Sequence, residues 1–207
     1  MEHVALYGLT THRAVKRAVF SGDGTAANNV VRALLAEERL FRHGSVLTAS
    51  KRSLSPKDLH QSRAVLQHCC LGTRLRPLVP RADLEAILTP ITEQSGTTLP
   101  KSARCIIDRK RRLSLIRVQP DVASGSELDL ARELGKLQSL IEGRPFRPWV
   151  SLASRGGFSL TYLMTDVAKA GELSRWLPRR PLYATLRSTP VMIPVDVHHV
   201  QLSERAA

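Results

Sequence analysis

Apolar residues recur at helical spacing in two short segments near the start of the chain, and a short extended pattern follows them. Thr10 or Thr11 can cap a first helix over 11–20, whose apolar stripe is Ala14, Val15, Ala18 and Val19. The run SGDG at 21–24 interrupts that helix. Thr25 then stands where the cap of a second helix belongs, and the residues expected inside are Val30, Val31, Leu34 and Leu35.

An extended pattern resumes at Leu40–Arg42, the pair His43-Gly44 offers a turn, and 45–49 supplies a return strand. Two helices, a tight turn and a hairpin in this order are typical of the winged-helix variant of the DNA-binding helix-turn-helix. After Pro56, a good first-turn residue, 57–70 predicts a further helix. The sequence therefore predicts a first domain over residues 1–70.

Prolines and glycines punctuate residues 71–100 around one short predicted helix at 81–88, which indicates a domain junction near Leu71. Beyond it, β-like runs at 103–107 and 113–118 flank the charged run DRKRR and predict a hairpin. An amphipathic helix is expected over 126–142. We expect residues 71–207 to form a second, α/β domain.

The rest of this second domain is less sharply patterned. Residues 149–153 and 159–164 are strand-like, and the second run can alternatively begin the helix expected over 166–177. The segments 181–186 and 191–200 fit either a last helix or a pair of strands. Arg155-Gly156-Gly157 is expected to be a turn.

The charge balance favours a polyanionic partner. The 207 residues carry 31 Lys and Arg against 18 Asp and Glu, a formal net charge of +13, and 43% are hydrophobic, as in a globular protein. The basic residues are spread over the chain, so the charge belongs to the folded body. Cys69, Cys70 and Cys105 match neither a disulfide framework nor a metal-ligand spacing, which favours a reducing compartment. No secretory signal or long apolar stretch is visible, so we expect a cytoplasmic protein.

The second predicted helix carries the candidate base readers. In a helix-turn-helix this element presents its N-terminal residues to the major groove, where Asn pairs with adenine and Arg with guanine. The candidates for DNA binding on it are Thr25, Asn28, Asn29 and Arg32. The predicted wing tip and the residues just beyond it add candidates for phosphate or minor-groove contacts, which are Arg42, His43, Lys51 and Arg52.

The run VVRALLAEERLFRHGSVLTAS, within 10–50, and the order of hairpin, helix with Gly135-Lys136-Leu137 and following strand within 103–189 resemble the replication-relaxation type of mobile-element proteins. This resemblance implies an α+β protein, in which a winged helix-turn-helix precedes a small α/β domain with a PD-(D/E)xK nuclease-like fold. Active nucleases of that fold hold Mg²⁺ with an Asp and a downstream Asp/Glu-x-Lys.

Here Asp108 can stand for the first carboxylate, but Arg117 replaces the second acid and Gln119 the lysine. An arginine at a metal ligand's position would repel the cation, so we expect the second domain to be degenerate and non-catalytic. Asp121, Glu127 and Asp129 follow in a loop and at a helix start, where acids commonly favour the helix dipole.

Other candidate chemistry is sparse. His198 and His199 follow Asp196, but adjacent residues of a strand point to opposite faces and cannot easily share one ion. No nucleophile elbow and no phosphate-cradling loop occurs. We therefore expect no catalytic residues, no metal and no cofactor.

These observations predict a sequence-specific double-stranded DNA-binding protein, a transcriptional or replication/transfer regulator of a bacterial mobile element that acts as a nucleoid- or plasmid-associated homodimer. One alternative is a metal-dependent nuclease or nicking accessory built on the second domain. Another is a basic scaffold that binds a protein and uses the helix-turn-helix only for packing.

Overall fold

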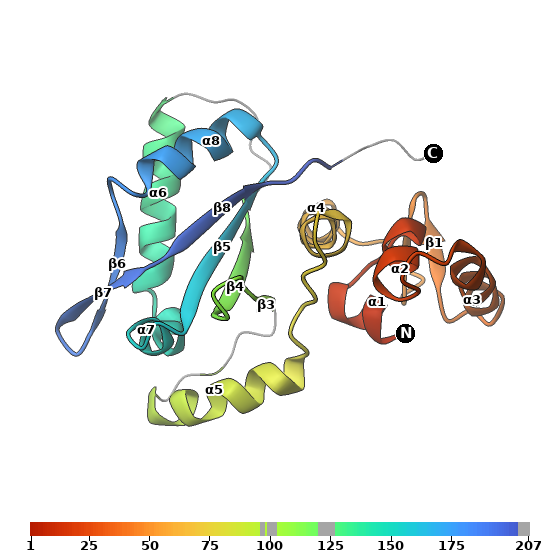
Figure 1. Ribbon diagram of the computed structural model, residues 1–207, viewed down its shortest axis with the longest axis horizontal. Helices are drawn as coiled ribbons and strands as arrows, with labels where there is room; N and C mark the ends of the chain where they lie inside the picture. The colour runs from red at the N-terminus through yellow and green to blue at the C-terminus, as the bar shows by residue number, and fades with distance from the viewer. Residues whose placement is uncertain (96–97, 99–102, 120–126, 203–207) are drawn as a thin grey trace. The chain divides into compact units, whose positions relative to one another are not determined.

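The computed structural model describes residues 1–95, 98, 103–119 and 127–202 of the chain (Figure 1). The structure belongs to the α+β class, as predicted. It divides into two compact units. Of the described residues, the N-terminal unit comprises Met1–Leu78 with Val200–Leu202, and the C-terminal unit lies within Val79–His199.

The N-terminal unit begins with three helices, α1 (Glu2–Tyr7), α2 (His12–Ala18) and α3 (Gly24–Ala36). The sequence did not predict α1, which ends at Gly8 in the left-handed conformation, φ 78°. The cap of α2 is confirmed, since the Thr11 hydroxyl accepts a hydrogen bond from the Ala14 amide at 3.2 Å.

Two expectations about α3 were wrong. Its cap is Asp23 and not Thr25, because the Asp23 carboxylate accepts hydrogen bonds from the Thr25 and Ala26 amides at 2.9 and 3.0 Å. Val30 does not point inward but is 41% exposed, because the core-facing side of α3 is narrow and centres on Ala27 and Val31. Thr25 instead lies in the first turn of the helix with an exposed side chain.

A short hairpin follows α3, as predicted. Strands β1 (Phe41–His43) and β2 (Val46–Thr48) pair antiparallel with Arg42 opposite Leu47. Gly44 has φ 61° in the turn between them, a conformation that glycine adopts without strain. The next helix, α4 (Pro56–Leu66), has proline in its first turn and continues into a π-helical turn over Gln67–Leu71.

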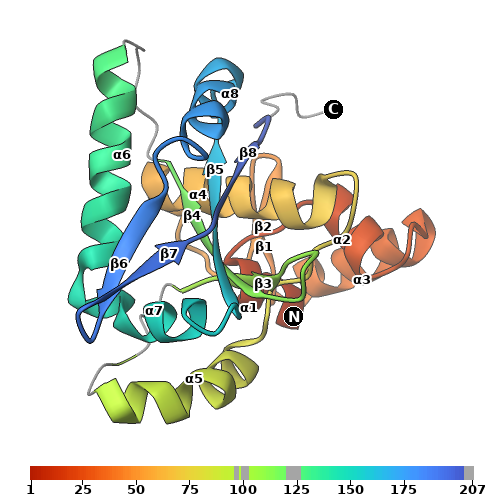
Figure 2. The ribbon, with the colours of Figure 1, turned by 60° about the vertical axis from the view of Figure 1, so that its left-hand side comes forward.

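The C-terminal unit is built on a four-stranded sheet in the order β3-β4-β5-β8. Its strands are β3 (Cys105–Ile107), β4 (Leu113–Val118), β5 (Phe158–Met164) and β8 (Val195–His199). The predicted β3–β4 hairpin is antiparallel, whereas β4, β5 and β8 are mutually parallel (Figure 2). Parallel neighbours need crossover connections, and helices supply them here.

One face of this sheet carries the core of the unit. Alternate residues of β4 and β5, including Leu115, Phe158 and Leu160, pack with Trp149 and Leu173 of the helices. The elements around this core are α5 (Arg81–Ser95), α6 (Glu127–Glu142), α7 (Arg147–Ala153), α8 (Val167–Trp176), and the hairpin of β6 (Leu182–Leu186) and β7 (Thr189–Ile193).

Residues 149–153 were predicted as strand-like, and this prediction was wrong. They belong to α7, which starts with a proline in its first turn and buries Trp149 and Val150 against the sheet. The helix expected at 81–88 extends instead to Ser95, through Pro90. Residues 159–164 form a strand, and 181–200 form strands rather than a helix. Within the described ranges, no helix is long and apolar enough to cross a membrane.

Candidate nucleic-acid interface

The polar face of α3 carries the predicted base readers. Positions 25, 28, 29 and 32 recur at helical spacing and therefore share one face. All four side chains are exposed, and within the described ranges none has a hydrogen-bond or ion-pair partner; they are Thr25, Asn28, Asn29 and Arg32. The structure thus brings the predicted readers together and leaves their polar groups available to a ligand.

The opposite face of α3 is held in a small core. Ala27 and Val31 are 0% and 3% exposed and pack with Val15 of α2 and Leu47 of β2. Figure 1 shows α2 and α3 side by side within this unit. The polar face is therefore fixed in direction by the packing of the other side of the helix.

The turn between α2 and α3 is closed by its own backbone. The Gly22 amide donates to the Lys16 carbonyl at 2.8 Å, and the Asp23 amide donates to the Phe20 carbonyl at 2.9 Å. Ser21 and Gly22 have φ 50° and 99°, so the chain reverses within a few residues. This turn places the cap of α3 directly after α2.

The β1–β2 hairpin is tied to the segment before α2. Thr10 and Leu47 exchange two backbone hydrogen bonds of 2.8 Å each, and the Thr10 side chain is fully buried. Arg63 of α4 also donates to the Ser45 hydroxyl in the hairpin turn at 3.1 Å. The sequence analysis missed both contacts, because they join residues that are 37 and 18 positions apart and no local motif marks them.

The predicted wing residues lie in three different settings. Arg42 is exposed in β1, but it is not at the tip, which Gly44 and Ser45 occupy. His43 ends β1, and its Nε2 lies 3.1 Å from the Ser50 carbonyl oxygen. Of the remaining two candidates, Arg52 has an exposed side chain.

Lys51 has internal partners. Its ammonium group lies 2.7 Å from the Glu38 carboxylate and 5.5 Å from the centre of the Phe41 ring. Both charged side chains are 69% exposed, so water and salt weaken the pair and DNA phosphate can compete for the lysine. Arg17, a basic residue of α2, instead donates to the Leu71 and Thr73 carbonyls at 3.3 Å.

The charge of the N-terminal unit suits an anionic ligand. Residues 1–78 contain twelve Lys and Arg against five Asp and Glu. Two of the acids, Glu37 and Glu38, lie just after α3, and each pairs with a basic neighbour, Arg39 or Lys51. No acidic residue lies within Thr25–Arg32.

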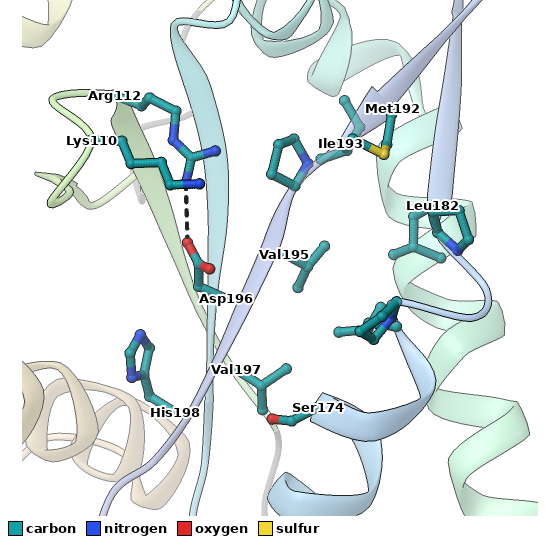
Figure 3. Close-up of a pocket in the computed structure, with 14 residues that line it drawn as sticks. Lys110, Arg112, Ser174, Leu182, Met192, Ile193, Val195, Asp196, Val197 and His198 are labelled. Carbon is teal, nitrogen blue, oxygen red and sulfur yellow. Dashed lines mark hydrogen bonds and ion pairs between the residues drawn. The ribbon is translucent and has the colours of Figure 1, made fainter.

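The C-terminal unit contains a second polar cluster beside a pocket of about 510 Å³ (Figure 3). Arg112 bridges two acids, with Nε 2.6 Å from Asp108 and a terminal nitrogen 3.3 Å from Asp196. The Ser159 hydroxyl donates to the same Asp108 carboxylate at 3.1 Å. Apolar side chains, including Leu182, complete the pocket.

Asp108, the residue expected at the place of the nuclease carboxylate, is bound by Arg112 and Ser159 within this network. Burial alone would raise the pKa of Asp108, but hydrogen bonds from Arg112, its positive charge and the Ser159 hydroxyl together hold that pKa below its usual value. The carboxylate is ionised at neutral pH and already balanced by a guanidinium.

Arg117 lies on β4, and its Nε is buried with no hydrogen-bond partner in the described part of the chain. Burial lowers the pKa of this guanidinium, and the nearby Cys105 acts in the opposite direction. A half-buried cation on this strand disfavours a divalent ion beside it. Asp121 lies outside the described residues, as do the side chains of Glu127 and Asp129.

The two C-terminal histidines lie on β8, where His198 is paired in register with Leu163 and His199 with Met164. Successive strand residues point to opposite faces, and the His199 Nε2 lies 3.2 Å from the Thr165 carbonyl oxygen. Among the residues that the structure describes, no three His, Cys, Asp or Glu side chains are grouped to hold a metal ion.

The three cysteines are free and buried, and burial raises the pKa of Cys105 to about 12, so its thiol is protonated and unreactive at neutral pH. No protein-family model matches the chain, and no curated protein or solved structure matches it either.

Proposed function

We propose that the N-terminal unit is a winged helix that binds double-stranded DNA, with α3 as its recognition helix and β1–β2 as its wing. The order of elements supports this, since α1, the bridge at Thr10, α2, α3 and the hairpin follow one another. The main support is the exposed face of α3. Four polar side chains without partners in the described chain share the exposed face of a helix whose other face is locked in a core.

The residue types on that face suit base recognition. An α-helix fits the major groove, where an asparagine amide can pair bidentately with adenine and a guanidinium with guanine. Asn28 and Arg32 are four residues apart and lie on neighbouring turns of α3. In this proposal they read bases, while Arg42, Lys51 and Arg52 contact backbone phosphates.

The test is a titration of labelled duplex DNA with the full-length protein, read by fluorescence anisotropy at several salt concentrations. Binding that releases counterions from phosphates weakens steeply as salt rises, by about 0.9 in log K per log unit of salt for each phosphate contacted. We expect micromolar or tighter binding to random duplex with this dependence, and tighter binding to a duplex selected from a random library.

The matched variants are Asn28→Ala with Arg32→Ala, and Arg74→Ala as the control. Arg74 is also exposed in the N-terminal unit, lies in the segment after α4, and removes the same charge. The double variant should lose preference for the selected duplex, and the control should keep it. No salt-sensitive binding by the wild type, or identical behaviour of both variants, contradicts the proposal.

We also propose that the C-terminal unit is a degenerate, non-catalytic relative of the PD-(D/E)xK nucleases. The antiparallel β3–β4 hairpin, the helix α6 and the parallel strand β5 follow the order that the resemblance implies. Asp108 bound to Arg112, together with the half-buried Arg117, supports the absence of a catalytic metal site.

Supercoiled plasmid incubated with the protein and Mg²⁺ or Mn²⁺ tests the alternative of a nuclease or nicking accessory. We expect the plasmid to remain supercoiled. Metal-dependent cleavage that is lost in Asp108→Ala, at a temperature where thermal unfolding shows this variant still folded, would establish the nuclease instead.

In the cell, we propose a transcriptional or replication/transfer regulator of a bacterial mobile element, acting as a homodimer on nucleoid or plasmid DNA in the cytoplasm. One winged helix buries little DNA surface, and two half-sites raise affinity, which supports the dimer. Light scattering of the protein with and without a selected duplex measures the stoichiometry, and one protomer per duplex would contradict the proposed homodimer.

If the protein is instead a scaffold that binds only protein, the Asn28, Arg32 double variant should keep full partner binding and the wild type should bind no DNA.

A further inference from the structure

The turn between β3 and β4 is built around a single carboxylate. One oxygen of Asp108 accepts hydrogen bonds from the backbone amides of Lys110 and Arg112, both at 2.8 Å. The Asp108 amide in turn donates to the Arg112 carbonyl at 2.9 Å, and the Arg111 amide donates to the Asp108 carbonyl at 3.1 Å. These bonds fix the backbone of the turn.

Four basic residues follow Asp108, and the structure treats them differently. Arg112 is turned inward, 14% exposed, and held by Asp108 and Asp196. Arg109, Lys110 and Arg111 are exposed, and within the described ranges none of them has an ion pair. We call these three residues the basic turn. The acid that organises the turn is already neutralised by Arg112, so these three adjacent positive charges have no ion-pair partner in the described chain. Lys110 also lines the pocket with Arg112 and Asp196 (Figure 3).

The backbone at Arg111 is unusual for its residue type. It has φ 59°, in the left-handed region that glycine and asparagine occupy more easily. Glycine, which fits this backbone without strain, carries no charge.

We propose that the basic turn is a second DNA-contacting element that binds backbone phosphates, so that recognition by α3 is joined by a sequence-independent contact from the C-terminal unit. This rests on the proposed function of the N-terminal unit. Adjacent arginine and lysine side chains on a fixed turn suit phosphate oxygens, and they carry no information about sequence. The basic turn therefore contributes to affinity and salt dependence and leaves base preference unchanged.

The first experiment replaces Arg109, Lys110 and Arg111 together by serine in the full-length protein and repeats the anisotropy titrations on selected and scrambled duplexes. We expect both affinities to fall by a similar factor, on the order of tenfold or more at about 0.1 M salt, and the salt slope to decrease by about two to three. The ratio of the two affinities should stay constant.

The second experiment separates function from folding by relieving the backbone strain. Arg111→Gly should raise the melting temperature of the protein while weakening binding to both duplexes. Arg187→Gly is the matched control, because Arg187 is an exposed arginine with φ 49° in the β6–β7 turn of the same unit. It should also raise the melting temperature but leave DNA affinity unchanged.

The outcomes distinguish this inference from the function on which it rests. If the wild type binds no duplex, both fail. If the wild type binds and the triple variant keeps its affinity and salt slope, the basic turn is not a DNA contact and the role of α3 stands. Sedimentation with vesicles that contain anionic lipid provides a further arm. Vesicle binding that needs the basic turn, with DNA binding that does not, would overturn the proposal in favour of a membrane surface.

Discussion

The polar face of α3 and the Asp108–Arg112–Asp196 cluster contain similar kinds of residues in opposite states. Arg32 is exposed and has no partner in the described chain, whereas Arg112 is mostly buried and binds two carboxylates. Polar groups satisfied within the protein stabilise its fold, and polar groups left open are free for a ligand. We propose recognition by α3 and a structural role for the cluster, of which the sequence analysis related only Asp108 to a nuclease carboxylate.

The largest expected effect is on stability, in Asp108→Ala. This change leaves Arg112 with only Asp196, at 3.3 Å, and removes the carboxylate that accepts hydrogen bonds from two amides of the turn. We expect a loss of about 2–4 kcal/mol in the free energy of unfolding, measured by chemical denaturation. A loss below about 0.5 kcal/mol would show that the cluster is not structural.

The same carboxylate predicts a pH dependence. Because the pKa of Asp108 is lower in the folded than in the unfolded protein, its contribution is complete above its unfolded pKa, near 3.8. That contribution is lost as pH falls from there through the folded pKa. Between about pH 5 and pH 2, the wild type should therefore lose more stability than Asp108→Ala does. Parallel losses in both proteins would contradict the pKa shift.

Arg32→Ala should weaken DNA binding and leave stability nearly unchanged, the reverse of what we expect for Asp108→Ala. We expect a loss of about 1–3 kcal/mol in binding to a selected duplex, because one bidentate base contact disappears. The free energy of unfolding should change by less than about 0.5 kcal/mol, because the side chain is exposed and has no hydrogen-bond or ion-pair partner in the described chain. Titration and denaturation of the same preparation measure both quantities. A stability loss larger than the binding loss would show that Arg32 has a structural role and not a binding role.

The corrected cap of α3 gives a smaller effect. Asp23→Ala should cost about 1 kcal/mol of stability, because the Thr25 and Ala26 amides lose their acceptor. Thr25→Ala should leave stability nearly unchanged and weaken DNA binding only. Thermal unfolding of the two variants ranks them, and equal destabilisation would restore Thr25 as a capping residue.

The smallest effect is expected at the exposed pair of Lys51 and Glu38. Either residue changed to Ala should alter stability by less than about 0.5 kcal/mol, since both side chains are 69% exposed. Glu38→Ala should strengthen DNA binding slightly by freeing the lysine. A titration at low salt detects this, and weaker binding by Glu38→Ala would contradict a phosphate contact by Lys51.

Local patterns predicted much of the fold because the elements they describe are local. The Thr11 cap, the helix α3, the β1–β2 and β3–β4 hairpins and the helix α6 follow from turn residues and apolar spacing. The segment 149–153 was wrongly predicted as a strand, because Trp149 and Val150 favour strands in isolation. Prolines at the start of a helix and burial against the sheet decided its state.

In the candidate site, too, local spacing predicted some features and long-range contacts determined the others. Spacing alone placed Asn28, Asn29 and Arg32 on one helix face, because that face is a property of helical geometry. The setting of Asp108 was not predictable, since Arg112 joins it to Asp196, which lies 84 residues beyond Arg112. Long-range partners of this kind depend on the order of strands in the sheet, which no local pattern encodes.

The ratio of affinities for a selected and a scrambled duplex, measured for the wild type, Arg32→Ala and Arg74→Ala under one salt condition, tests the role of α3 most directly. We expect a large ratio for the wild type and for Arg74→Ala, and a ratio reduced by about tenfold or more for Arg32→Ala. An Arg32→Ala protein that keeps the full ratio would show that α3 does not read bases.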